Sequence, residues 1–180
     1  ISKILRFRVL IRLNTSLKKY LDNFFKRIFF KFFYSLSDTI IVNSKFFQKE
    51  LSNELNLRSH LIYNLNTNRK KRKKLNFFKK FNGKKILNIG RLTDQKDQLT
   101  LIKGLEILKK KNKKFRCCII GRGGFKNILI SEIKRLNLGK YIKLVGFKNN
   151  AEQYISQSDI FVLSSKFEGL PNVLIESQSY

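Results

Sequence analysis

The chain is poor in cysteine and histidine, and this scarcity restricts its cellular compartment and the catalytic groups it can use. Its 180 residues include two cysteines, one histidine, one proline and no methionine or tryptophan. Cys117 and Cys118 are adjacent in an apolar run, where neighbouring side chains point to opposite faces of a strand and bridge badly. We therefore predict reduced thiols and a cytosolic protein. The only histidine, His60, opens a predicted strand, and we interpret it as a surface residue and not as a catalytic base.

Long uncharged apolar runs are also missing. A membrane-spanning helix needs about 18 consecutive apolar residues, but Lys26, Arg27 and Lys31 interrupt the phenylalanine-rich stretch 24–34. No cleavable signal segment is visible either. The sequence starts at Ile1, without an initiator methionine, and stops at Tyr180 inside a strongly patterned segment. We therefore expect a fragment that is incomplete at both ends.

Acidic residues are scarce. Twelve aspartates and glutamates face 39 lysines and arginines, giving a net charge of +27 and an isoelectric point of about 10.4. Such a charge suits a polyanionic partner, either nucleic acid or an anionic bilayer. Mutational bias towards A/T-rich codons, which enriches lysine, asparagine, isoleucine and phenylalanine, explains the same composition. The charge therefore identifies no partner and does not indicate the fold.

The first part of the chain reads as alternating strands and helices. We predict a strand over 7–13, followed by a helix over 17–34 whose apolar residues recur at three- and four-residue steps. Packing of this apolar stripe on a sheet is the favoured interpretation, with docking on a membrane surface as a secondary role. A strand over 39–42, a helix from the N-cap Ser44 to Glu54 and a strand over 60–63 follow.

A basic segment separates this part from the next. Residues 64–83 show little periodicity, contain the run 69–74 of six lysines and arginines, and end in the turn Asn82–Gly83. We predict a solvated linker, with a nuclear address or a nucleic-acid patch as the alternative.

Regular alternation returns after residue 84. It indicates a parallel, doubly wound α/β sheet, in which ligands bind at the carboxyl ends of the strands. The predicted strands are 85–89, 116–120, 141–145 and 160–163, and the predicted helices are 99–110, 128–136, 150–156 and one that opens at Pro171.

Two strand-end loops combine glycines with cations. In 90–96, Arg91 and Lys96 can converge on one pyrophosphate, although two solvent-facing charges explain them equally well. The loop 121–124 contains Gly121, Arg122, Gly123 and Gly124, which would let a ligand approach the backbone closely. It lacks the third glycine of the dinucleotide-binding fingerprint, so an ordinary turn remains an alternative.

A third strand-end loop, 164–176, carries two carboxylates. Glu168 precedes a helix and Glu176 lies within it, while free amides around Asn172 and Val173 form an anion site. A carboxylate near that site can accept hydrogen bonds from two adjacent hydroxyls of a ribose or a hexose. A dipole-favoured acid at a helix start explains Glu168 without any ligand, but it does not explain Glu176.

These motifs together resemble family 4 glycosyltransferases. The resemblance rests on Gly90-Arg91-Leu92 with Lys96 and on Phe167 to Asn172 through Glu176, with weaker similarity at 37–44, 61–64 and 145–147. It implies an α/β fold of GT-B type with two Rossmann-like domains, each with a parallel sheet and each incomplete here. Residues 1–64 would end the acceptor-side domain, 65–83 would be the basic linker, and 84–180 would form a truncated donor-nucleotide-binding domain.

The family also implies an activity. Its members transfer a sugar from a nucleotide-diphosphate sugar with retention of configuration, and they need no metal or other cofactor. We expect a uridine nucleotide as donor and a cell-envelope polysaccharide or glycolipid as acceptor. A cytoplasmic protein with peripheral contact to the anionic inner face of the membrane is expected, and nucleic acid is not an expected partner. The fragment alone is expected to be inactive.

The resemblance assigns roles to single residues. Arg91 and Lys96 would neutralise the donor diphosphate as the sugar bond breaks, Glu168 would touch the transferred sugar, and Glu176 would hold the ribose hydroxyls. We predict Arg91, Lys96 and Glu168 as catalytic residues. The predicted donor-binding residues are Gly90, Gly121, Gly123, Val145, Phe147, Gly169, Leu170, Pro171, Asn172, Val173 and Glu176.

Two alternatives remain at this stage. A sugar-nucleotide epimerase or a phosphorylase can share the same two-domain plan, since fold does not fix function. A basic nucleic-acid-binding protein would instead bind any polyanion, with steep salt dependence and no need for Glu176. The sequence also departs from the family at Asp97, where glycine is common.

Overall fold

The computed structural model describes residues 7–18, 20–64, 78 and 81–180. By its internal contacts the chain divides into two units, residues 1–65 with 168–171 and residues 66–167 with 172–180. Each unit is described by itself below. The basic run 69–74 lies outside the described residues, so the linker stays a prediction.

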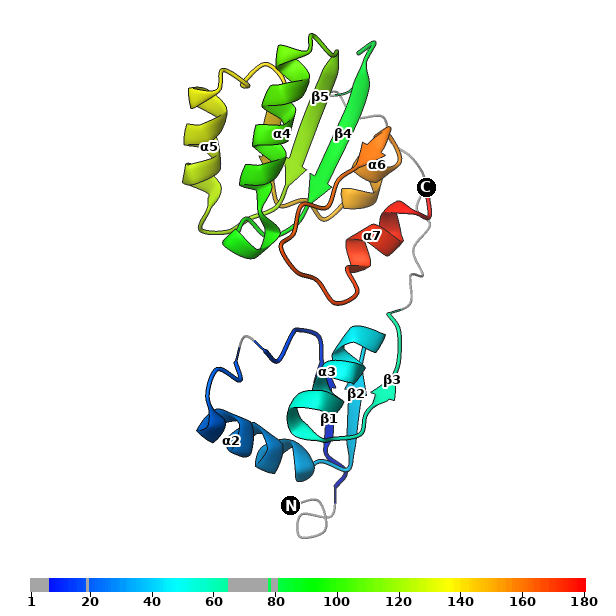
Figure 1. Ribbon diagram of the computed structural model, residues 1–180. Helices are drawn as coiled ribbons and strands as arrows, with labels where there is room; N and C mark the ends of the chain where they lie inside the picture. The colour runs from blue at the N-terminus through cyan, green and yellow to red at the C-terminus, as the bar shows by residue number, and fades with distance from the viewer. Residues whose placement is uncertain (1–6, 19, 65–77, 79–80) are drawn as a thin grey trace. The chain divides into compact units, whose positions relative to one another are not determined.

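Among its described residues, the first unit holds a parallel three-stranded sheet in the order β1-β2-β3 and the helices α2 and α3 (Figure 1). Its core joins Leu13, Ile40 and Val42 of the strands to Phe47, Leu51 and Leu55 of one helix. The elements are β1 (Leu10–Leu13), α2 (Phe24–Ser35), β2 (Thr39–Val42), α3 (Lys45–Leu55) and β3 (His60–Leu61). His60 is exposed, as predicted.

Helix α3 begins and ends as its sequence indicates. The Ser44 side chain accepts a hydrogen bond from the Phe47 amide at 3.2 Å, which confirms the predicted N-cap. Asn56 ends the helix in the left-handed conformation, with φ of 53°. Within the helix, the buried Glu50 carboxylate accepts hydrogen bonds from the Ser16 hydroxyl at 2.5 Å and from the Leu17 and Lys18 amides at 3.1 and 3.0 Å. Glu50 therefore fixes the segment that follows β1.

Helix α2 corrects one prediction. The helix starts at Phe24 and not at residue 17, after the Asn23 side chain has accepted a hydrogen bond from the Lys26 amide. None of its residues is buried, and only Phe30 and Tyr34 pack partly against the core. The prediction that its apolar stripe packs on the sheet is therefore wrong for most of the stripe in this chain.

The second unit is a parallel four-stranded sheet in the order β6-β5-β4-β7 (Figure 1). Its strands alternate with helices along the chain, which confirms the predicted α/β class. The elements are β4 (Lys84–Ile89), the 3-10 turn η2 (Asp94–Lys96), α4 (Gln98–Lys110), β5 (Phe115–Ile120), α5 (Lys126–Arg135), β6 (Ile142–Gly146), α6 (Ala151–Ile155), β7 (Ile160–Phe161) and α7 (Asn172–Ser177).

Two apolar clusters cover the two faces of this sheet. On one face, residues of α4 and α5 pack around Cys117; on the other, Tyr154 and Ile155 of α6 pack around Cys118. Both thiols are buried and free, as their alternation along β5 predicted. Burial raises the pKa of Cys118 to about 12, and it raises the pKa of Cys117 as well.

Candidate functional site

The carboxyl ends of the four parallel strands share one edge of the second sheet, because all pairings in this sheet are parallel. Three of the predicted site segments leave the strands at this edge. They are the loop 90–97 after β4, the loop 121–125 after β5 and the segment 162–167 after β7. Hydrogen bonds connect all three.

The loop after β4 is held by buried groups below it. The Gly90 amide donates to the Ile120 carbonyl at 3.0 Å, which extends the β4–β5 pairing by one residue. The Gln98 side chain is 1% exposed and donates to the Arg91 carbonyl at 3.0 Å. This contact fixes the backbone of the loop while the Arg91 side chain stays exposed. Sequence reasoning missed Gln98, because a glutamine at a helix start gives no signal of burial.

Lys96 lies beside the start of the same loop. A Cβ placed on Gly90 would be 3.4 Å from Cδ of Lys96, so the aliphatic part of the lysine lies against the glycine. Asp97 caps α4 in the left-handed conformation, with φ of 45°. That conformation is the physical reason why glycine would also fit this position. The structure thus brings the backbone of Gly90 and the side chain of Lys96 together.

The glycines after β5 allow the loop 90–97 to pack closely against the loop 121–125. A Cβ on Gly121 would lie 1.8 Å from the Gly90 carbonyl oxygen, and a Cβ on Gly123 would lie 2.3 Å from the Leu92 carbonyl oxygen. The Leu92 amide donates to the Arg122 carbonyl at 3.0 Å, and the Phe125 amide donates to the Leu92 carbonyl at 3.0 Å. Close packing of two loops therefore accounts for these glycines, in addition to any approach of a ligand.

The segment after β7 joins the first loop from the other side. The Ser164 hydroxyl donates to the Lys96 carbonyl at 2.9 Å, and the Lys166 amide donates to the Gln95 carbonyl at 2.9 Å. Lys166 also forms an ion pair with Asp94, at 2.6 Å. The hydrogen bond to Asp94 raises the pKa of the Lys166 side chain, which is about half exposed. Lys166 and Ser164 are additional residues of this edge that sequence reasoning did not single out.

The end of β6 contributes an aromatic ring. Phe147 is 59% exposed, and the guanidinium carbon of Arg122 lies 5.2 Å from its ring centroid, a cation–π contact. The Gly121 amide donates to the Gly146 carbonyl at 3.0 Å, so the loops after β5 and β6 are adjacent. Val145 is half-buried against the α6 face of the sheet. The two segments predicted to frame a base therefore lie side by side.

The glutamate motif is divided between the two contact units. Glu168, Gly169, Leu170 and Pro171 group with the first unit, whereas 172–180 groups with the second. Asn172 and Glu176 are exposed on α7, and Val173 is half-buried. That Glu168 and Glu176 share one donor site with Arg91 and Lys96 therefore stays a prediction.

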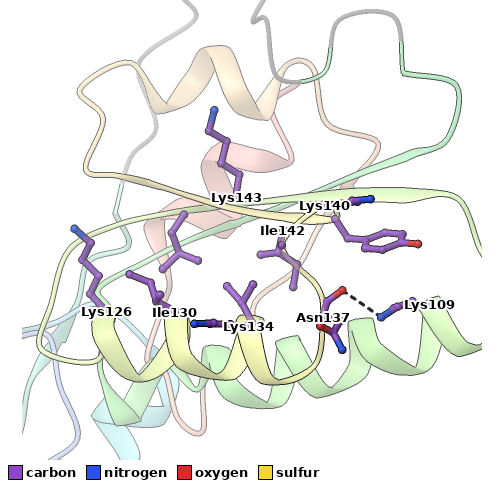
Figure 2. A pocket seen from close by; sticks show the side chains of 12 residues that line it. Lys109, Lys126, Ile130, Lys134, Asn137, Lys140, Ile142 and Lys143 are labelled. Atoms are coloured by element: carbon purple, nitrogen blue, oxygen red, sulfur yellow. Dashed lines mark hydrogen bonds between the residues drawn. The ribbon is translucent and has the colours of Figure 1, made fainter.

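A pocket of about 800 Å³ lies away from these residues, between α5 and the edge strand β6 (Figure 2). Its floor is apolar, with Ile130 and Ile142, and Lys109 at one end donates to the Asn137 carbonyl at 3.2 Å. None of the predicted site residues lines it. The lysines among its lining residues are Lys109, Lys126, Lys134, Lys140 and Lys143.

The described residues hold no group of three or more metal-ligating side chains. No helix in the described part of the chain is long and apolar enough to cross a membrane. The arrangement is thus a sheet edge with exposed cations, tight glycine loops and an aromatic rim, which suits a phosphate-containing ligand with a flat ring.

A doubly wound parallel sheet with these loops at its carboxyl edge is the architecture of the Rossmann-like class of domains, and the chain is similar in fold to solved GT-B glycosyltransferases. One of them, Anabaena HepE in complex with UDP and glucose, gives a TM-score of 0.77 at 19% identity, covering 98% of this chain and 51% of that one. The chain belongs to the family described as glycosyl transferases group 1, whose model matches residues 67–180. The predicted family and fold are thereby confirmed.

Two curated relatives extend over most of this chain. An uncharacterized glycosyltransferase of Methanocaldococcus jannaschii is 31% identical and covers 99% of this chain, which spans 47% of that relative. The N-acetylgalactosamine-N,N'-diacetylbacillosaminyl-diphospho-undecaprenol 4-alpha-N-acetylgalactosaminyltransferase of Campylobacter jejuni is 33% identical over 88% of this chain and 44% of its own length. The chain therefore spans about half the length of these relatives.

Proposed function

We propose that this chain carries the donor-binding part of a retaining glycosyltransferase that moves a sugar from a nucleotide-diphosphate sugar to a cell-envelope polysaccharide or glycolipid. The observation that carries the proposal is the junction of three strand-end loops at residues 90–97. It holds Lys96 against Gly90 and fixes the backbone of Arg91, in a chain of the group 1 family. Fixed cations at such a position stabilise the charge that develops on a leaving diphosphate.

The remaining roles follow the family pattern. Glu176 would accept hydrogen bonds from the ribose hydroxyls, Glu168 would contact the transferred sugar, and backbone amides of 169–173 would contact phosphate and sugar. The base would lie between Gly121 and Gly123 on one side and Val145 and Phe147 on the other. The contact between Arg122 and Phe147 supports this part, because a flat cation on a ring offers a stacking surface.

We propose a uridine nucleotide as the donor and a lipid-linked glycan as the acceptor. Support for uridine comes from HepE, which was solved with UDP. Support for a lipid-linked acceptor comes from the Campylobacter relative, whose name includes diphospho-undecaprenol.

Calorimetric titration with UDP and GDP tests the donor assignment. We expect saturable binding of UDP, weakened about tenfold or more by Arg91→Ala, because a charge-assisted contact to diphosphate is lost, and weakened similarly by Glu176→Ala. Arg135→Ala is the matched control, because Arg135 is an exposed arginine of α5 that pairs with Glu132 at 2.7 Å.

Two results would contradict this proposal. Binding that Arg91→Ala and Glu176→Ala both leave unchanged would remove these two residues from the site. Binding of any polyanion with steep salt dependence, indifferent to Glu176→Ala, would favour the nucleic-acid alternative. If UDP binds as expected, analysis of the product that the full-length protein forms from a UDP-sugar separates a transferase from an epimerase, which would return a nucleotide sugar.

A further inference from the structure

The pocket between α5 and β6 has an apolar centre (Figure 2). On α5, Lys126, Ile130 and Lys134 follow one another at four-residue steps, so they lie on one side of the helix. On β6, Ile142 and Leu144 point to the face that packs on α4 and α5. Ile130 is 46% exposed, and Leu144 is only half-buried. We call the pocket lined by this side of α5 and by residues 139–144 the β6 groove.

The charges around the β6 groove have one sign. Its described lining includes five lysines and no aspartate or glutamate. Lys109 closes one end, because it donates to two carbonyls that follow α5, both at 3.2 Å. Lys126, Lys134 and Lys140 are exposed. Figure 2 shows Lys126 and Lys140 at opposite ends of the groove. The groove therefore suits a ligand with an apolar centre and anionic ends.

The sheet edge beside the groove is open among the described strands. β6 pairs with β5 and ends the sheet order β6-β5-β4-β7. The Cys117 amide donates to the Tyr141 carbonyl at 2.7 Å. Backbone groups alternate along a strand, so those of Ile142 and Leu144 point away from β5. The Ile142 amide donates to the Leu138 carbonyl at 2.9 Å. The Ile142 carbonyl and both backbone groups of Leu144 thus face the side on which a further strand would pair.

The charge of the edge selects the kind of strand that fits. Figure 2 shows Lys143 on the opposite side of β6 from Ile142, so cations lie on both sides of the open edge. Lysines on an edge strand discourage pairing with another basic strand. Pairing of two β6 edges would bring the lysines of two copies together, in a chain with a net charge of +27. An acidic strand of a different protein has the complementary charge.

We propose that the β6 groove binds an acidic, extended segment of another protein, which adds a strand to the open edge of β6. Two apolar side chains at alternate positions would enter the centre of the groove. Carboxylates on either side of them would pair with Lys126 at one end and Lys140 at the other. Main-chain hydrogen bonds to Ile142 and Leu144 would hold the strand. The proposal is independent of the donor assignment, because none of the predicted site residues lines the groove.

Fluorescence anisotropy of a labelled peptide, Glu-Glu-Val-Glu-Val-Glu-Glu, titrated with the full-length protein tests the proposal. We expect saturable binding. The control peptide Glu-Glu-Glu-Val-Val-Glu-Glu has the same composition and charge, but its two valines point to opposite sides of a strand. We expect this peptide to bind about fivefold more weakly, because one valine stays outside the groove. Equal affinities of the two peptides, or no binding of either, would overturn the proposal.

Two N-methylated forms of the first peptide test the main-chain hydrogen bonds. One form is methylated at both valine amides, and the other at the amides of the two glutamates that follow the valines. These two sets of amides point to opposite edges of a strand. We expect only one form to lose binding, and its identity tells whether the added strand is parallel or antiparallel to β6. Equal affinities of the two forms would contradict strand addition.

Charge variants locate the binding site. We expect K126Q/K140Q to weaken binding of the first peptide about fivefold, because two ion pairs are lost. K103Q/K113Q is the matched control, because it removes two exposed lysines that do not line the groove. Equal losses in both double variants would mean that the peptide binds the basic surface as a whole. A DNA oligonucleotide that displaces the peptide and is weakened in the same way by K126Q/K140Q would assign the groove to nucleic acid instead.

An isoleucine pair on α5 tests the apolar centre. We expect I130S to weaken binding about fivefold. I128S should leave it unchanged, because Ile128 is 48% exposed on the same helix and does not line the groove. Circular dichroism and urea midpoints of both variants show whether the fold is intact. Equal peptide affinities of two folded variants would remove the apolar centre from the site.

Discussion

Gly121 is the residue whose replacement the structure forbids most clearly. Its Cα lies so close to the first loop that any Cβ would overlap the Gly90 carbonyl, at 1.8 Å. Because that atom belongs to the backbone, it can move only if the loop carrying Arg91 moves with it. The glycine therefore protects the geometry of a loop that is distant in sequence.

We predict that Gly121→Ala lowers the free energy of unfolding of the second unit by about 2–3 kcal/mol, the range expected for overpacking against backbone. Gly124→Ala is the matched control, because a Cβ at Gly124 has no atom within 4 Å. Urea denaturation followed by circular dichroism measures both. Equal urea midpoints for the two variants would show that the loop 90–97 can move without loss of stability.

Sequence reasoning found the glycines after β5 but not the reason for them. From the sequence, Gly121 and Gly123 indicated a close approach of a ligand or an ordinary turn. The contact that explains these glycines joins two loops about 30 residues apart in the sequence. No local sequence pattern predicts such a contact. The same holds for Gln98 and Ser164, whose partners are backbone carbonyls of another segment.

At the scale of elements, Glu50 and Glu54 lie on the same helix but have different partners. The Glu50 carboxylate is buried and accepts three hydrogen bonds from 16–18. Glu54 makes an ion pair with Arg27, whose side chain is half exposed. Buried donors that lose their acceptor cost far more than a surface ion pair.

We therefore predict that Glu50→Ala lowers the free energy of unfolding of the first unit by about 2–4 kcal/mol, whereas Glu54→Ala lowers it by less than about 1 kcal/mol. Chemical denaturation of the two variants in parallel measures the difference. A Glu50→Ala variant as stable as Glu54→Ala would mean that water replaces the lost carboxylate.

The helices and strands also show which parts of the fold can be predicted from local sequence patterns. The N-cap of α3 and the strands of the second unit were predicted because local propensity and burial agree there. For α2 the three- and four-residue spacing correctly indicated a helix from residue 24 onward. The spacing could not indicate what the apolar stripe packs against. Helices that pack on a protein core and helices that lie in a membrane interface have the same three- and four-residue spacing.

At the scale of the whole molecule, the excess of basic residues opposes compactness. With 39 basic and 12 acidic residues, like charges repel one another at neutral pH. Raising the ionic strength from about 10 mM to about 150 mM shortens the screening length from about 30 Å to about 8 Å. We predict that the unfolding temperature rises by about 2–4 °C, the shift that corresponds to about 1 kcal/mol in a chain of this size.

Differential scanning fluorimetry with an external dye measures this shift. Near the isoelectric point of about 10.4 the repulsion vanishes, so the same salt step should leave the unfolding temperature unchanged. A salt effect of equal size at both pH values would assign it to burial of apolar surface and not to charge.

Cys117 and Cys118 are consecutive in β5, yet their side chains enter different clusters. Local opening on the α4 and α5 side exposes one sulfur, and opening on the α6 side exposes the other. Timed alkylation followed by peptide mass spectrometry therefore gives two alkylation rates, one for each thiol of the dipeptide. The ratio of the two alkylation rates would report which face of the sheet opens more often, with no residue replaced.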